Sequence, residues 1–180
     1  TNMATSHSFL PIAKNRQIFE DLVTRTLDYA RSLGASDAAA EASEAQGLAV
    51  SVRRGKVETV EQTRDRSLDI TVFAGQRRGS ASTSDFSDNA LRQTVEAAWH
   101  IARYTAEDPA AGLPDADLLA IGARNTLQLH HPWAVTVEQA TEIALEAEHA
   151  ALATDKRITN TEGASIDTHE GHFILGNTRG

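Results

Sequence analysis

The chain has 180 residues, 41% of them apolar, which is enough to bury the core of one ordinary domain or of a tight pair of small ones. Its net charge of −8 disfavours binding to nucleic-acid phosphates and offers no basic face to an anionic membrane. Cysteine is absent, which excludes disulfides, thiolate nucleophiles and sulfur-ligated metals.

The first residues do not resemble a targeting signal. Thr1–Ile12 lacks the basic region and apolar stretch of a secretory signal, and we expect residues 1–14 to form a flexible arm. No run of about 18 apolar residues predicts a membrane-spanning helix anywhere in the chain. These features, together with the lack of cysteine, favour a cytoplasmic protein.

The first predicted helix is Arg16–Leu33, because its apolar residues recur every three or four positions and Gly34 follows as a C-terminal cap. Strands come next. Asp37–Gln46 is ambiguous between helix and strand, and we take it as an opening strand. Alternating residues then predict four short strands joined by turns at Arg54-Gly55 and Gly75-Gln76. These four strands are Leu48–Arg53, Lys56–Gln62, Leu68–Ala74 and Arg77–Thr83.

Two further long helices are predicted. Ser84-Asp85 and Ser87-Asp88 are both candidate N-terminal caps of the second helix, which ends near Thr105. Its predicted buried face is Leu91, Val95, Ala98, Trp99 and Ala102. A surface loop with a short helical turn at Asp115–Leu119 follows.

Thr136 and Gln139 form a capping box that opens the third helix. Its predicted buried stripe is Val137, Ala140, Ala144, Ala147 and Ala151, with the acidic row Glu138, Glu142 and Glu146 facing solvent. We expect two last strands, Ile158–Ser165 and His172–Leu175, joined through Asp167–Gly171. The predicted fold class is α+β: a mainly antiparallel sheet of hairpins flanked by three long helices, with residues 15–180 as one domain.

The histidines do not form a recognisable metal motif. In His169-Glu170-Gly171-His172 the histidines are three residues apart, whereas a zinc-binding helix of the zincin type needs them four apart. His130-His131 precedes Pro132, which fixes an extended segment in which adjacent side chains diverge. His100 and His149 lie on predicted helices. We therefore predict no metal site and no catalytic residue in this chain.

Small residues in the strand Arg77–Thr83 suggest a contact surface. Ser80, Ser82 and Ser84 lack the sharp turn and neighbouring base that a nucleophilic serine needs. A strand of small residues lets another backbone approach closely, so it either packs beneath a helix or contacts a subunit or peptide. The candidate contact residues are Arg78, Gly79, Ser80, Ala81, Ser82 and Thr83.

Basic residues concentrate around the predicted hairpins. They are Arg53, Arg54, Lys56, Arg64, Arg66, Arg77 and Arg78. Such residues either keep the hairpin ends solvated or attract an acidic partner surface or a peptide carboxylate. Without interleaved aromatic residues they do not indicate nucleic-acid binding.

Several motifs, taken in order, resemble the amino-terminal domain of the TldD/PmbA (TldE) family, and its PmbA (TldE) branch in particular. The motifs are Gly34-Ala35-Ser36-Asp37, residues 52–58, Ile70-Thr71-Val72, residues 78–83, residues 101–105, Asp108-Pro109 with Ala111-Gly112, and residues 155–163. The resemblance covers residues 15 to 180.

The resemblance implies a two-subunit metalloprotease assembly that processes unfolded peptides. In that family, zinc belongs to the TldD-type subunit, in a region that would follow this chain. The chain is therefore expected to be the amino-terminal portion of a non-catalytic subunit, whose partner is a TldD-type subunit or a second copy.

Two alternatives remain open at this point. The complete protein could carry its own downstream zinc motif and act as a homodimeric peptidase. The chain could instead be a module that binds extended peptides at a sheet edge without any catalysis.

Overall fold

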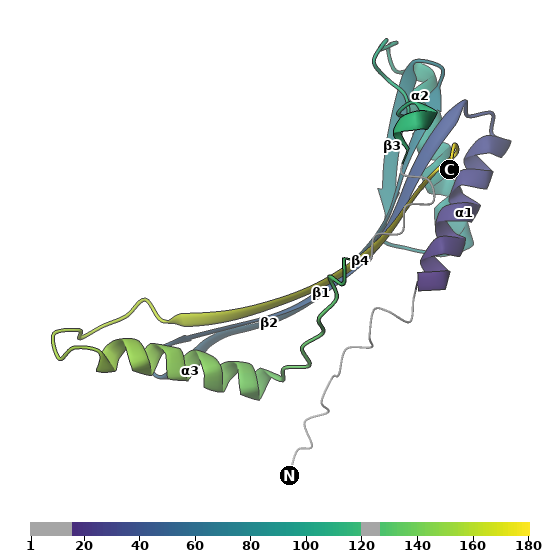
Figure 1. Ribbon diagram of the computed structural model, residues 1–180. Helices are drawn as coiled ribbons and strands as arrows, with labels where there is room; N and C mark the ends of the chain where they lie inside the picture. Colours follow the sequence, from purple (N-terminus) through teal and green to yellow (C-terminus); the bar gives the residue numbers. More distant parts are fainter. Residues whose placement is uncertain (1–15, 120–126) are drawn as a thin grey trace. The chain divides into compact units, whose positions relative to one another are not determined.

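The structure is a computed structural model that describes residues 16–119 and 127–180 (Figure 1). The expected arm at residues 1–14 lies outside the described residues. The main elements in chain order are helix α1 (Arg16–Ser32), strands β1 (Asp37–Arg53), β2 (Lys56–Ala74) and β3 (Arg77–Thr83), helices α2 (Asp88–Tyr104) and α3 (Val137–Ala153), and strand β4 (Ala164–Asn177). A short 3₁₀ helix, η2 (Ala116–Leu118), lies within the predicted helical turn.

The strands form an antiparallel sheet in the order β3-β2-β1-β4, which confirms the predicted α+β class. Both predicted turns are present. Arg54 and Gly55 have positive φ angles of 54° and 69°, as a type I′ hairpin requires. Gly75 has a φ of 64°, which suits the first position of a type II′ turn between β2 and β3.

The strands are fewer and longer than predicted. Lys56–Gln62 and Leu68–Ala74 are both parts of β2, and Asp37–Gln46 continues into Leu48–Arg53 as β1. Residues Lys56–Arg66 are exposed on both faces, so the alternation of apolar and polar residues that identifies a strand is missing there.

The predicted break at Asp167–Gly171 is also wrong. These residues lie inside β4, a single strand from Ala164 to Asn177, while residues 158–163 precede it and are not a strand. The polar composition of this segment suggested a turn, but its residues continue the strand, and their side chains alternate between the two faces of the sheet.

The described residues form two compact units. Unit 1 contains residues 45–64 and 128–170, and unit 2 contains residues 16–44, 65–119, 127 and 171–180. Strands β1, β2 and β4 each continue from one unit into the other. Each unit has its own hydrophobic core.

In unit 2, α1 and α2 contribute to one core with the strands. The buried face of α1 comprises Phe19, Leu22, Val23, Thr26, Leu27 and Ala30, which recur every three or four positions as predicted. Helix α2 begins as predicted, since the Ser87 hydroxyl accepts a hydrogen bond from the Ala90 N–H at 3.3 Å. Trp99 packs against this core and is partly buried.

Replacing Trp99 with alanine should lower the free energy of unfolding by about 3 kcal/mol, at the small end of the range for truncating a large aromatic residue. The indole is only partly buried, so part of its surface already contacts water. Urea denaturation of the variant measures the loss. A loss below about 1 kcal/mol would mean that Trp99 contributes little to this core.

In unit 1, α3 packs on β1 through a core of Leu48, Val50, Val52, Ala140 and Ala144. The predicted capping box is present. Glu138, Glu142 and Glu146 are exposed, as expected, but so are Ala147 and Ala151, which were predicted to be buried. The buried stripe advances by four residues from Ala144, so that Glu148 is buried instead.

Candidate functional site

Strand β3 lies at an edge of the sheet, and its two faces have different surroundings. Gly79 is buried, and Ala81 packs against the core of unit 2. A Cβ atom on Gly79 would lie only 2.1 Å from the Ala98 carbonyl oxygen of α2. The small residues on this face therefore let α2 approach the sheet closely.

The other face of β3 is open. Arg78, Ser80 and Ser82 are exposed, and the Ser80 and Thr71 hydroxyls form a hydrogen bond of 2.9 Å across the strands. Ala74 pairs with Arg77 beside the two-residue turn, and in such a hairpin this pair is hydrogen-bonded. By alternation, the backbone groups of residues 78, 80 and 82 point away from β2, toward the edge of the sheet.

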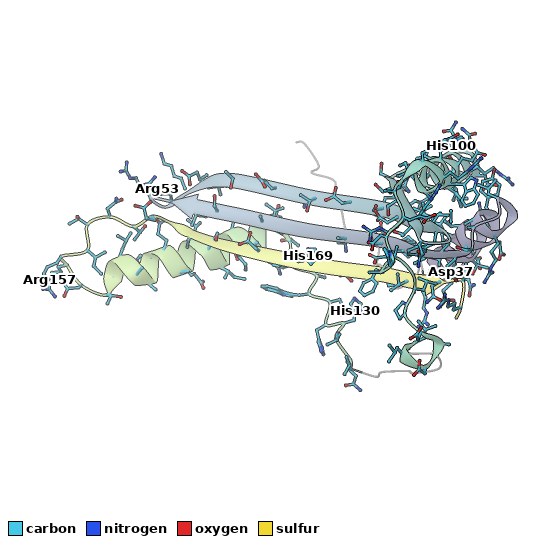
Figure 2. All side chains as sticks on the ribbon, turned by 90° about the horizontal axis from the view of Figure 1, so that it is seen from above. Asp37, Arg53, His100, His130, Arg157 and His169 are labelled. Atoms are coloured by element: carbon cyan, nitrogen blue, oxygen red, sulfur yellow. The ribbon has the colours of Figure 1, made fainter. Side chains whose placement is uncertain are left out.

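The motif His169-Glu170-Gly171-His172 lies within β4, where successive side chains point to opposite faces of the sheet. His169 lies on β4 and is exposed (Figure 2). Glu170 and His172 are partly buried on the opposite face of the strand. The His172 ring packs on Phe19 with the ring centroids 5.0 Å apart, and its Nδ1 atom is buried without a partner among the described residues. Burial, with a contribution from Arg16, lowers the pKa of His172.

Glu170 instead joins a polar group in unit 1 that the sequence did not predict. The His130 Nε2 atom lies 2.6 Å from Glu170 Oε1, and Gln46 Nε2 donates to Glu170 Oε2 at 2.6 Å. The hydrogen bond from His130 is the main cause that lowers the pKa of Glu170. Two histidine-containing motifs are thus brought together, but nothing in their spacing along the chain indicated this.

A second carboxylate, Glu148, holds the hairpin that joins β1 and β2. Its Oε1 atom accepts the Arg54 N–H at 2.7 Å and its Oε2 atom accepts the Gly55 N–H at 2.8 Å. The Thr161 hydroxyl donates to Oε1 at 2.7 Å. These donors, led by the Gly55 N–H and the Thr161 hydroxyl, lower the pKa of Glu148.

The basic residues are divided between the two units. Arg53, Arg54 and Lys56 surround the hairpin of unit 1, whereas Arg77 and Arg78 begin β3 in unit 2. Arg53 approaches Glu162 at 3.9 Å, and Arg77 pairs with Glu107 at 3.2 Å. This distribution agrees with charged, solvated hairpin ends.

Metal ligands are not grouped in the described parts of the chain. Within residues 16–119 and 127–180, no three His, Asp or Glu side chains are arranged so as to hold a metal ion. No helix in the same ranges is long and apolar enough to cross a membrane.

Two family descriptions match this chain. Residues 38–102 match the PmbA/TldA metallopeptidase domain 1, and residues 130–180 match the PmbA/TldA metallopeptidase central domain. The chain is also 47% identical over 170 residues to Metalloprotease PmbA of Escherichia coli O157:H7. The chain belongs to the PmbA/TldD family. Its similarity to a Metalloprotease PmbA homolog of Haemophilus influenzae is nearly as high, at 44% identity over 164 residues.

The chain spans only part of these family members. The matches cover 94% and 91% of this chain, but 37% and 36% of the Escherichia coli and Haemophilus influenzae proteins. The metallopeptidase descriptions imply a metal in the family, and the described residues here do not fit one.

Two solved structures share the fold. A candidate modulator of DNA gyrase from Bacteroides thetaiotaomicron superposes with a TM-score of 0.82 at 21% identity, covering 92% of this chain and 38% of that one. TldE from Thermococcus kodakarensis gives a TM-score of 0.67 at 14% identity, covering 89% of this chain and 35% of that one.

Proposed function

We propose that this chain is the amino-terminal portion of a PmbA (TldE)-like subunit that is not itself catalytic. It works with a TldD-type subunit in a cytoplasmic assembly that processes unfolded peptides. Zinc belongs to the TldD-type partner in this proposal. The observation that carries the PmbA-like part of this proposal is the 47% identity to Metalloprotease PmbA of Escherichia coli O157:H7 over 94% of this chain.

The alternative with the strongest support is a peptidase whose metal site lies in the remaining part of a longer protein. It is favoured by the description of the Escherichia coli relative as a metalloprotease, of which this chain spans 37%. The two proposals differ in whether a protein that contains this chain binds zinc and cleaves peptides by itself.

We further propose that the edge of β3 is where this portion of the subunit contacts an extended peptide or its partner. Gly79 and Ala81 serve packing against α2 and the core, so Arg78, Ser80 and Ser82 remain to make the contact. Thr83 pairs with Leu68 of β2 in the same register as Gly79 and Ala81, so its backbone groups do not point to this edge. Unpaired backbone groups at a sheet edge can pair with an added strand.

A proline in place of Ser80 tests this contact. Proline removes the outward-pointing N–H without removing a hydrogen bond to β2. Losing one backbone hydrogen bond should weaken peptide cleavage by the assembly roughly fivefold to tenfold. The assay uses the protein that contains this chain together with a TldD-type partner.

Alanine at Ser80 is the matched control, because it retains the backbone N–H and should leave cleavage nearly unchanged. Circular dichroism checks that both variants are folded. If the proline variant is folded, assembles and cleaves peptides like the unmodified protein, β3 is not part of the contact surface.

A further inference from the structure

The open face of β3 carries a basic side chain that no neighbour neutralises. Arg78 is exposed, and the residue opposite it on β2 is the uncharged Phe73. The neighbouring Arg77 pairs with Glu107 at 3.2 Å, whereas the Arg78 guanidinium has no hydrogen-bond or ion-pair partner within the described ranges. An acidic side chain brought beside β3 can therefore pair with Arg78 without breaking an existing contact.

Charge differs between the two ends of this edge. Asp69 of β2 lies opposite Ser82, and Ser82 is four residues from Arg78, about 13 Å along an extended strand. A carboxylate beside β3 is attracted at Arg78 and disfavoured at Ser82, where Asp69 is near. The edge thus favours an acidic side chain at one place, the end next to the turn Gly75-Gln76.

The next residue of β3 faces α2, and an apolar side chain of that helix lies beside it. A Cβ atom on Gly79 would lie 2.9 Å from the Ile101 Cβ atom, yet Ile101 retains 47% of its accessible surface. Helix α1 packs on the opposite flank of α2, where the Tyr29 hydroxyl donates to Glu96 at 2.5 Å. Ile101 is five residues beyond Glu96, about 140° around the helix. Its exposed surface therefore faces away from α1, toward the outer edge of β3.

A peptide strand added to β3 meets both side chains. Successive residues of a strand point to opposite faces, so the peptide residue opposite Arg78 lies on the open face and the one opposite Gly79 lies on the α2 side. We propose that the β3 edge selects extended peptides in which an acidic residue is next to an apolar one. Arg78 contacts the acidic side chain and Ile101 the apolar one. This inference rests on the peptide contact proposed for β3 and adds the class of peptide.

Exchange of charge tests the role of Arg78. The probes are fluorescein-labelled peptides of about eight residues in which threonine and valine alternate, with a central threonine replaced by glutamate or lysine. The protein that contains this chain should bind the glutamate peptide about threefold more tightly than the lysine peptide. Arg78→Glu should change the ratio of the two dissociation constants about tenfold in favour of lysine, because every attraction becomes a repulsion. Fluorescence anisotropy measures the constants.

Lys56→Glu is the control for this change. It alters the net charge by the same amount, but Lys56 belongs to unit 1 and not to β3, so the ratio should stay within about twofold of its original value.

A second variant tests the apolar contact. Ile101→Gln should weaken binding of the glutamate peptide about fivefold, because the valine beside position 101 loses an apolar neighbour. A peptide with serine in place of each valine should bind this variant and the unmodified protein equally. Ile18→Gln is the control, since Ile18 is 59% exposed on α1. Circular dichroism confirms that the variants are folded.

The outcomes separate this inference from the contact on which it rests. A ratio that Arg78→Glu leaves unchanged, or equal binding of the glutamate peptide by folded Ile101→Gln, would overturn the selectivity. If Ser80→Pro still weakened every peptide in that case, β3 would remain the contact and only the class of peptide would be wrong. Peptides that do not bind, or that bind Ser80→Pro unchanged, would overturn both proposals.

Discussion

Replacing Gly79 with alanine should reduce the free energy of unfolding by about 3 kcal/mol, a large effect for one added methyl group. The new Cβ atom would lie 2.1 Å from the Ala98 carbonyl oxygen and 2.4 Å from the Ala102 nitrogen. Both atoms belong to the backbone of α2, so no side chain can rotate to relieve the overlap. Helix α2 must move away from β3, which opens the core of unit 2. Urea denaturation followed by circular dichroism measures the loss.

Ser80→Ala is the matched control for this change. Ser80 is the next residue, but it is exposed on the opposite face of β3. Ser80→Ala should change the free energy of unfolding by no more than about 0.5 kcal/mol, because it removes only an exposed hydrogen bond between the Ser80 and Thr71 hydroxyls. If Gly79→Ala and Ser80→Ala had equal effects, the close approach of α2 to β3 would not contribute to stability.

Replacing Glu148 with alanine should lower the midpoint of thermal unfolding by roughly 5–10 °C. The change removes the carboxylate that accepts three hydrogen bonds. The donors are the N–H groups of Arg54 and Gly55 and the Thr161 hydroxyl. Glu148 is only 2% exposed, so water does not readily replace its carboxylate. Differential scanning calorimetry measures the midpoint.

Glu146→Ala on the same helix is the control, since Glu146 is exposed and the alanine substitution should change the midpoint little. An equal response of the two variants would show that Glu148 does not hold the hairpin.

The effect of Glu148 should also depend on pH. Its pKa is lowered in the folded chain, mainly by the Gly55 N–H. A carboxylate with a lowered folded pKa stabilises the fold above its unfolded pKa, and this contribution is lost as the pH falls through the folded value. The difference in stability between the unmodified chain and Glu148→Ala should therefore be full near neutral pH and shrink in acid.

The helices and turns could be predicted from the sequence because caps and turn residues act on their immediate neighbours in the chain. The caps at Ser87 and Thr136 and the positive φ angles at Gly55 and Gly75 follow from residues within a few positions. Strand lengths depended on tertiary context. The exposed half of β2 has no buried face to produce alternation, so its continuity could not be seen in the sequence.

The candidate site was predictable only in part. The small residues of β3 indicated a close approach, and Gly79 indeed lies beneath α2, but the sequence could not separate its packed face from its open one. Glu148 was missed because an acidic residue on an alanine-rich helix is usually solvated. Its four-residue spacing from Ala144 was the one available signal.

We propose that the protein containing this chain is a PmbA (TldE)-like subunit that does not carry the catalytic metal. The most direct test measures zinc by elemental analysis and peptide cleavage in the protein that contains this chain, purified alone and then mixed with a TldD-type subunit. The protein alone should contain far less than one zinc per chain and should cleave no peptide, and cleavage should appear only in the mixture. Stoichiometric zinc together with cleavage by the protein alone would contradict this proposal.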